Sequence, residues 1–143
     1  MSFKKTPILL SLIAIIISTT CQLTYGQMKT EEFTFEYDGK KYSGLLDLPT
    51  EGKPSEIIVI IHGHGKTNIE KNNRFNTYYN IRSEFVNAGF ACCVWDKAGC
   101  GKSEGEYKPN QTVQSSANEA LVAIEKLRQL NIVNPDKIGL WGG

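Results

Sequence analysis

Residues 57–65 constrain the fold of this chain more than any other segment. They read Ile-Ile-Val-Ile-Ile-His-Gly-His-Gly, so five consecutive β-branched residues run into a turn with two glycines. A short apolar run that does not alternate with polar residues is typical of a strand buried on both faces, as in parallel sheets. Open α/β sheets bind their ligands at the carboxyl ends of such strands. Because glycine lets the backbone approach a bound group closely, we expect the functional site at residues 62–65.

The segments around this strand alternate between strand and helix patterns. Four more segments have the length and composition of strands, namely residues 32–37, 42–48, 90–95 and 138–141. The first two are joined by Asp38-Gly39, a dipeptide typical of tight β-hairpins. Residues 78–88 carry apolar side chains at helical spacing and are followed by Gly89, which predicts a helix that ends there.

A second helix is predicted to begin at Ser116. Ser116 and Glu119 have the spacing of a capping box, in which each side chain satisfies a free backbone amide at the helix start. Small and apolar residues then recur every three positions, and this predicts the face that packs on the sheet. The residues of that predicted face are Ala117, Ala120, Leu121, Ala123, Ile124 and Leu127.

The predicted order of elements defines the fold class. It is strand, strand, strand, helix, strand, helix, strand, which is typical of an α/β protein with a parallel sheet and right-handed crossovers. The hairpin at the start is expected to form an antiparallel edge of that sheet. No internal repeat and no low-complexity tract interrupts this order.

Residues 1–26 have the pattern of a secretory signal peptide. Lys4 and Lys5 precede an apolar run over residues 7–17, and small polar residues follow it. The run is about half as long as the roughly 20 residues that cross a bilayer. We therefore expect export, and no stable membrane span once the signal is removed.

The cleavage site is expected after Gly26. Thr24 and Gly26 place small residues at the two positions that signal peptidase inspects, so the mature domain would cover residues 27–143 and be secreted or periplasmic. A lipid-modified Cys21 is the alternative, although Ser-Thr-Thr before it is a poor lead-in.

Charge and cysteine content exclude some classes of partner. The formal net charge is +1, and this near-neutral balance gives no support for a nucleic-acid or anionic-membrane partner, because such partners select a basic face. The predicted mature domain contains Cys92, Cys93 and Cys100, an odd number that leaves at least one thiol without an internal partner. Neighbours on a strand point to opposite faces, so Cys92 and Cys93 are expected to be small buried hydrophobes.

Two other kinds of site can be weighed from the sequence. Gly101-Lys102-Ser103 and Gly65-Lys66-Thr67 end like a phosphate-binding loop, but Asp96 and Ile60 stand where its first glycine should be. His62 and His64 are the only histidines, and no third metal ligand lies at a diagnostic spacing. We therefore expect neither a nucleotide, nor a metal, nor another cofactor.

Three motifs together resemble the α/β-hydrolase superfamily. The first is the His62-Gly63 turn after the third strand. The second is Asp-Lys-Ala-Gly-Cys-Gly-Lys-Ser at residues 96–103, and the third is Asp-Lys-Ile-Gly-Leu-Trp-Gly-Gly at residues 136–143. The chain is most similar to secreted serine esterases and peptidase-like members, and it corresponds to the N-terminal half of their sheet. The resemblance implies an enzyme that acts on ester or peptide acyl bonds through Ser-His-Asp chemistry.

The resemblance also implies roles for individual residues. The backbone N–H of His64 would supply half of the oxyanion hole, and Gly63 would belong to the oxyanion turn. His62, Asp96 and Ser103 would have structural roles in the turns. Tyr78, Tyr79 and the irregular segment 96–114 are weaker candidates for the border of a substrate pocket.

In the family, the nucleophilic serine stands in a G-x-S-x-G turn, and the acid and the histidine follow it. Gly142 and Gly143 match the first two places of that turn, so all three catalytic groups are expected beyond residue 143. Residues 27–143 alone are therefore expected to be inactive. They are also expected to be poorly soluble, because residues 138–141 would form an open sheet edge. A secreted, non-catalytic binding or structural domain is the alternative.

Overall fold

The computed structural model describes residues 28–50, 56–70, 77–132, 134 and 136–142. The predicted signal peptide, its cleavage site, Cys21 and Gly143 lie outside the described residues. Among the described helices, none has the length and apolar composition to cross a membrane.

The described elements follow the predicted order. They are β1 (Met28–Tyr37), β2 (Lys40–Pro49), β3 (Ile57–Ile61), α2 (Thr77–Asn87), β4 (Ala91–Trp95), α3 (Val113–Arg128) and β5 (Ile138–Gly142). The strands form one sheet in the order β1-β2-β4-β3-β5. β3 pairs in parallel with β4 and with β5, whereas β2 pairs antiparallel with β1 and with β4. The predicted α/β class and the antiparallel hairpin at the edge are confirmed.

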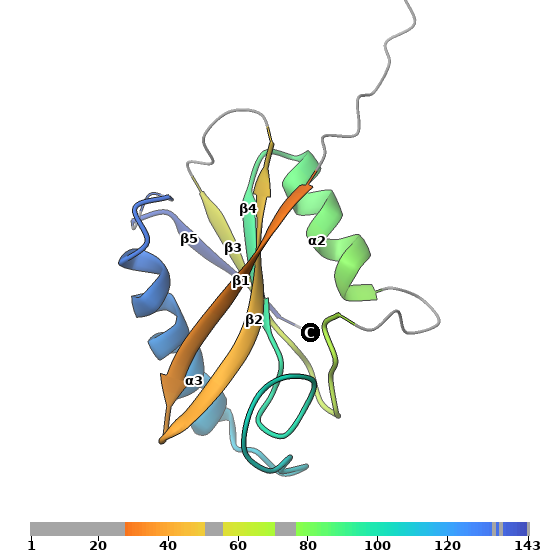
Figure 1. The fold of residues 1–143 in the computed structure, drawn as a ribbon, viewed down its shortest axis with the longest axis vertical. Coiled ribbons are helices and arrows are strands. Elements are labelled where there is room, and N and C mark those ends of the chain that lie inside the picture. The colour runs from red at the N-terminus through yellow and green to blue at the C-terminus, as the bar shows by residue number, and fades with distance from the viewer. Residues whose placement is uncertain (1–27, 51–55, 71–76, 133, 135, 143) are drawn as a thin grey trace, which may run out of the picture.

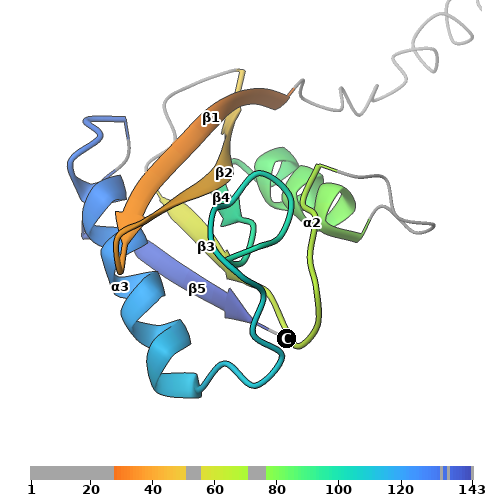
Figure 2. The same cartoon turned by 60° about the horizontal axis from the view of Figure 1, so that its bottom comes forward.

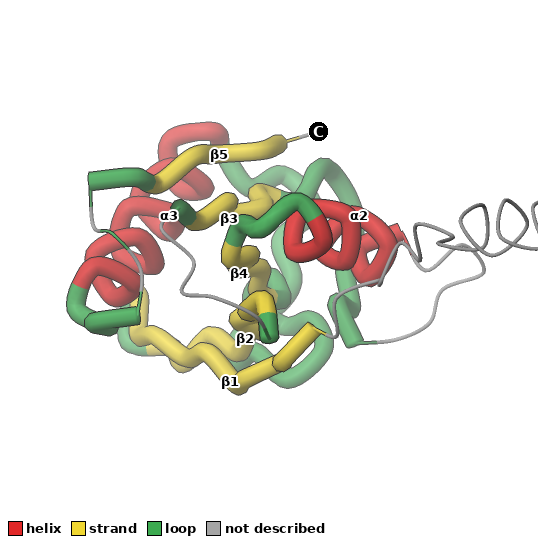
Figure 3. Tube along the Cα trace, turned by 90° about the horizontal axis from the view of Figure 1, so that it is seen from above, coloured by secondary structure: helices red, strands yellow, loops and turns green. Residues whose placement is uncertain are grey.

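The sheet lies between the two helices, with α3 on one face and α2 on the other (Figure 1, Figure 3). Alternation along β3 and β4 sends side chains to both faces. On the α3 side, the cluster of buried apolar side chains includes Ile57, Val59, Cys93 and Trp95. A second cluster of buried apolar side chains lies on the α2 side. That second cluster consists of Leu45, Ile60, Ile69, Val86, Cys92 and Val94. Burial on both faces is the reason that residues 57–61 are apolar without alternation.

The hairpin turn forms as expected from its two residues. Asp38 has φ 51° and Gly39 has φ 67°, the pair of positive angles that a type I′ turn requires. β1 begins at Met28, earlier than predicted. The first half of the strand carries mostly exposed polar side chains without an apolar pattern, so the sequence does not indicate it. Phe33 and Phe35 are buried on the α3 side of the sheet, as the alternation predicts.

The predicted start of the second helix is wrong. Helix α3 begins at Val113, and its N-cap is Thr112, whose hydroxyl accepts a hydrogen bond from the backbone N–H of Ser115. Glu119 does not cap the helix, because its buried carboxylate accepts a hydrogen bond from the indole N–H of Trp95 at 2.5 Å.

The predicted inner face of this helix is only partly correct. Ala120, Ala123 and Leu127 are buried against the sheet, whereas Leu121 is 63% exposed and Ala117 is also exposed. A spacing of three residues drifts by about 60° per step on a helix of 3.6 residues per turn. Side chains repeated at that spacing therefore cannot all remain on one face.

Strand β5 forms an edge of the described sheet. It pairs with β3, and Leu140 and Trp141 are 63% and 39% exposed. The three described cysteines, Cys92, Cys93 and Cys100, are buried free thiols. Cys92 and Cys93 lie in the clusters on opposite faces of the sheet, as expected.

A buried ion pair joins helix α2 to the antiparallel part of the sheet. The guanidinium of Arg82 contacts the carboxylate of Asp47 at 2.6 Å, and both side chains are almost completely buried. The hydroxyl of Thr30 donates to the other oxygen of Asp47 at 2.6 Å. The pair thus fixes α2 against β2 and β1, and nothing in the local sequence indicates it.

We expect Arg82→Met to destabilise the fold by about 3–5 kcal/mol, because it leaves Asp47 buried without its countercharge. Urea unfolding monitored by circular dichroism measures this loss. Arg128→Met is the matched control, since Arg128 contacts Glu125 at 3.6 Å on an exposed helix surface, and its cost should stay below about 1 kcal/mol. Equal losses in the two variants would contradict this account of the pair.

Candidate functional site

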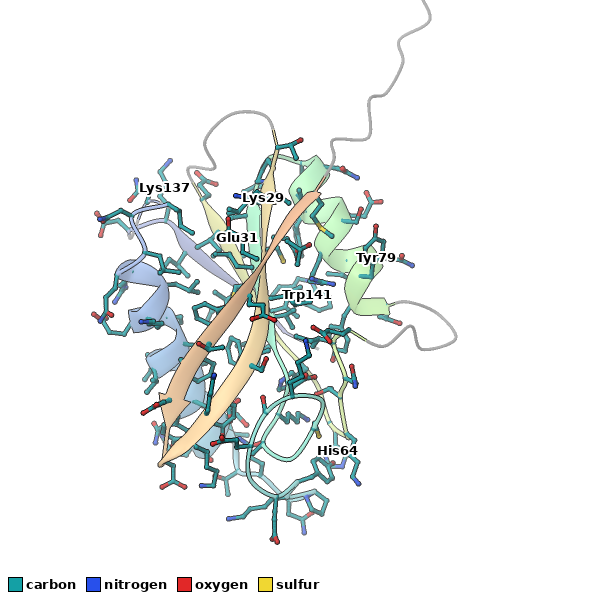
Figure 4. All side chains as sticks on the ribbon, viewed as in Figure 1. Lys29, Glu31, His64, Tyr79, Lys137 and Trp141 are labelled. Carbon is teal, nitrogen blue, oxygen red and sulfur yellow. The ribbon has the colours of Figure 1, made fainter. Side chains whose placement is uncertain are left out.

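The turn at residues 62–65 lies at the carboxyl end of β3, where the parallel strands β4 and β5 also end (Figure 2). His64 is exposed at the lower end of the molecule in Figure 4. Gly65 has φ +101°, a backbone angle that favours glycine. Within the described part of the chain, the backbone N–H of His64 makes no hydrogen bond. The turn therefore has a free backbone donor at the edge where the parallel strands of the sheet end.

Lys97 contacts this turn from the loop that follows the neighbouring strand, β4. Its ammonium donates to the carbonyl oxygen of Gly63 and, at 2.9 Å, to that of Gly65. Sequence reasoning missed this residue. Its position just after the end of β4 is the only local signal, because its partners lie 34 and 32 residues earlier in the chain.

Asp96 contacts the segment that follows the turn, at Ile69. One carboxylate oxygen accepts from the backbone N–H of Ile69 at 2.9 Å, and the other accepts from Lys102 N–H at 3.2 Å. Burial raises the pKa of Asp96, and these two amides partly offset the rise. A Cβ at Gly101, where φ is +51°, would overlap the Asp96 carboxylate. The predicted turn role of Asp96 is confirmed.

The ring of His62 lies between the turn and β4 and is partly buried. The ring packs edge-on against Trp95, with centroids 6.1 Å apart. Both ring nitrogens are buried and have no hydrogen-bond partner among the described residues. Burial, with a smaller contribution from the charge of Lys97, lowers the pKa of His62 to about 4. The ring is therefore uncharged at neutral pH, which agrees with a structural role.

Trp95 connects this histidine to helix α3. Its indole N–H donates to Glu119, and the second oxygen of Glu119 accepts from the side-chain amide of Gln111 at 3.1 Å. Across the sheet, a Cβ at Gly44 would overlap the carbonyl of Val94 and crowd Trp95. Gly44 pairs with Trp95 on the adjacent strand, and its lack of a side chain leaves room for Trp95.

Comparison with known proteins places this arrangement in a fold family. The chain is 30% identical over 108 residues to the quorum-quenching protein AidA of Acinetobacter baumannii, an alignment that covers 76% of this chain and 34% of AidA. The α/β hydrolase GrgF from Penicillium superposes with a TM-score of 0.65 at 22% identity, covering 81% of this chain and 37% of GrgF. The chain has the α/β-hydrolase fold.

A second α/β-hydrolase neighbour supports the same assignment. Est1E from Butyrivibrio proteoclasticus, solved with bound ferulic acid, superposes with a TM-score of 0.63 at 22% identity, over 77% of this chain and 41% of Est1E. No model of a known protein family matches the sequence. The chain thus spans between a third and a half of the length of these three proteins.

In this α/β-hydrolase fold, Ser103 and the two glycine-lysine motifs serve as loop structure. The hydroxyl of Ser103 donates to the Asp96 carbonyl at 2.8 Å and accepts from Ser43 N–H at 2.9 Å. Lys102 pairs with Glu70 at 2.8 Å, and Lys66 lies 5.5 Å from the ring centre of Tyr107. Neither motif opens a helix, so neither forms a phosphate-binding loop.

The loop after β4 borders a cavity of about 360 Å³ at the tip of the hairpin. Its walls include Tyr37 and Tyr42 from the hairpin, and Tyr107 and Gln111 from the loop. The other weak candidates lie elsewhere. Tyr78 packs against the α2-side cluster, and Tyr79 is half exposed on the outer side of α2, away from His64 (Figure 4).

We expect the stability of the fold to fall by up to about 3 kcal/mol as the pH drops from about 6.5 to about 4, through His62 alone. The unfolded chain binds a proton at His62 in this range and the folded chain does not. The stability that depends on an uncharged His62 is fully present above the pKa of His62 in the unfolded chain, and it is lost as the pH falls toward about 4. Urea unfolding at pH 7, 5 and 4 should show a shallower pH dependence in His62→Phe, whereas the exposed control His64→Phe should match the wild type. An unchanged slope in His62→Phe would refute this assignment.

Gly101→Ala should destabilise the fold by about 2 kcal/mol more than Gly39→Ala, because only at position 101 would the new methyl group displace a hydrogen-bonded, buried carboxylate. Both glycines have positive φ, and a Cβ at Gly39 would contact nothing within 4 Å. Gly39→Ala therefore reports the backbone strain by itself, about 1–2 kcal/mol. Thermal unfolding of the two variants measures the difference, and equal losses would show that the Asp96 contact is unimportant.

Proposed function

We propose that residues 27–143 form the N-terminal half of a secreted serine hydrolase that cleaves ester or peptide acyl bonds. The observation that supports this most directly is the free N–H of His64, presented at the carboxyl end of β3 by a turn that Lys97 contacts. Attack on an acyl carbonyl creates an oxyanion, and a fixed N–H aimed at it typically contributes about 10²–10³ in rate.

The register of β5 supports a nucleophile next to this donor. Gly142 pairs with Ile61, the residue before His62, so the end of β5 lies beside the start of the turn. In the proposed enzyme, Gly142 is the first glycine of a G-x-S-x-G turn whose serine follows residue 143. The N–H after that serine would complete the oxyanion hole with His64.

The described residues supply the donor without the attacking group. The hydroxyl of Ser103 is occupied within its turn, and His62 has no hydroxyl or carboxylate partner. A serine made nucleophilic by a histidine, with a carboxylate that orients the histidine, is the arrangement that the chemistry requires. We place these three groups beyond residue 143. The substrate would be a small acyl ester or a peptide.

The test compares the chain of residues 27–143 with the same chain extended through its downstream reading frame. Only the extended protein should hydrolyse p-nitrophenyl acetate above background, and a fluorophosphonate probe should abolish that turnover. Mass spectrometry of the labelled protein should locate the probe on a serine just after Gly143. Probe-sensitive turnover by residues 27–143, or labelling of Ser103, would overturn the proposal, and so would a downstream frame without Ser-x-Gly.

We also propose that residues 1–26 direct export and are removed before Gln27. The support is the basic start, the apolar run and the small residues Thr24 and Gly26. Mass spectrometry of the exported protein should give Gln27 as its first residue. A diacylglyceryl group on Cys21 would instead identify a lipoprotein, and an intact Met1 would exclude both forms of processing.

A further inference from the structure

The amine of Lys97 is hydrogen-bonded to the backbone on both sides of His64. Its two acceptors are the carbonyls of Gly63 and Gly65, so it contacts the peptide unit that precedes His64 and the one that follows Gly65. Hydrogen bonds from an ammonium are roughly twice as strong as those between neutral groups. A lysine in a polar loop is normally solvated. Lys97 instead donates to two carbonyl oxygens of one turn, and this restrains the turn.

The direction of the His64 N–H follows from the position of the Gly63 carbonyl. Both belong to one peptide unit, which is planar, and no described peptide bond is cis. In a trans peptide the C=O and the N–H point in opposite directions. A contact that fixes the Gly63 oxygen therefore also fixes the His64 hydrogen, on the opposite side of the turn from Lys97.

The turn needs such a contact because Gly63 restrains the peptide unit between Gly63 and His64 only weakly. Glycine has no Cβ to restrict its ψ, so within the turn only the φ of His64 opposes a rotation of this peptide. A rotation of half a turn would exchange the N–H for the C=O. The turn would then present an acceptor to a developing negative charge, and it would repel the charge that the site has to stabilise.

We propose that Lys97 is a positioning residue that holds the peptide unit between Gly63 and His64 in the orientation in which the N–H of His64 points at the oxyanion. This inference rests on the proposed function, because it assumes that His64 is an oxyanion donor. It adds a residue outside the turn, in the loop that follows β4. Lys97 acts through the backbone and does not touch the substrate.

The partly buried ring of His62 gives a second report on the same contact. It lies between the turn and Trp95, and the charge of Lys97 is the second-largest cause of its low pKa. Removal of the ammonium should therefore raise the pKa of His62. The chain has two histidines, His62 and His64, so their imidazole signals can be assigned from single variants.

The test compares Lys97→Met with Lys102→Met in the active, extended protein. Lys102 is the matched control, because it lies in the same loop and its amine pairs with exposed Glu70. Lys97→Met should lower kcat for p-nitrophenyl acetate by at least about 10-fold, with KM within about twofold, since the lost stabilisation is made only in the transition state. Lys102→Met should keep wild-type kcat, and Lys97→Arg, which keeps a donor, should recover part of the loss. A kcat for Lys97→Met within twofold of wild type would overturn the inference.

NMR spectroscopy of the same variants separates this inference from the proposed function. In Lys97→Met, the residual dipolar coupling of the His64 N–H should change and the pKa of His62 should rise, whereas Lys102→Met should alter neither. If the wild-type protein lacks esterase activity, the proposed function fails while these signals still decide whether Lys97 orients the peptide. An unchanged dipolar coupling in Lys97→Met would overturn the inference. Should Lys97→Met not fold, Lys97→Gln provides the same readouts.

Discussion

The last residue of β4 and the two residues that follow it hold the described part of the loop after β3. Trp95 packs on the ring of His62, Asp96 accepts from the backbone of Ile69, and Lys97 donates to the carbonyls of the glycines between them. Each contact reaches a different part of the described segment 62–70, so this segment is attached at three places to Trp95 and the two residues that follow it. This is possible because β3 and β4 are parallel and adjacent, and therefore end at the same edge of the sheet.

Other elements of the fold hold Trp95, the last residue of β4, in place. Helix α3 contributes Glu119, which bonds the indole of Trp95, and β2 contributes Gly44, whose missing side chain leaves space for the same indole. On the opposite face, the ion pair between Arg82 and Asp47 attaches helix α2 to β2. The site is thus a turn with two glycines whose geometry is held by contacts from neighbouring elements, and its own sequence specifies little of that geometry.

This division explains which features could be predicted from the sequence. The buried strand, the Asp38-Gly39 hairpin and the order of helices and strands along the chain follow from local composition and periodicity, and these predictions are confirmed. The start of α3 was not, because Ser116 and Glu119 match a capping box locally while the carboxylate of Glu119 is taken by Trp95 in the folded chain. Lys97 was missed for the same reason, since its partners are distant in the chain. Contacts across the sheet, rather than local pattern, decide these roles.

The rate at which the buried thiols are alkylated would report how often the fold opens around β4. Cys92 and Cys93 are fully enclosed on opposite faces of β4, burial raises the pKa of Cys92 to about 12 and that of Cys93 well above its ordinary value, and Cys100 is buried in the loop beyond. An alkylating reagent reacts with a thiolate, so it can modify Cys92 and Cys93 only while β4 is separated from its neighbours. None of these three described cysteines is in a disulfide, so each of them keeps a thiol that such a reagent can reach once its surroundings open.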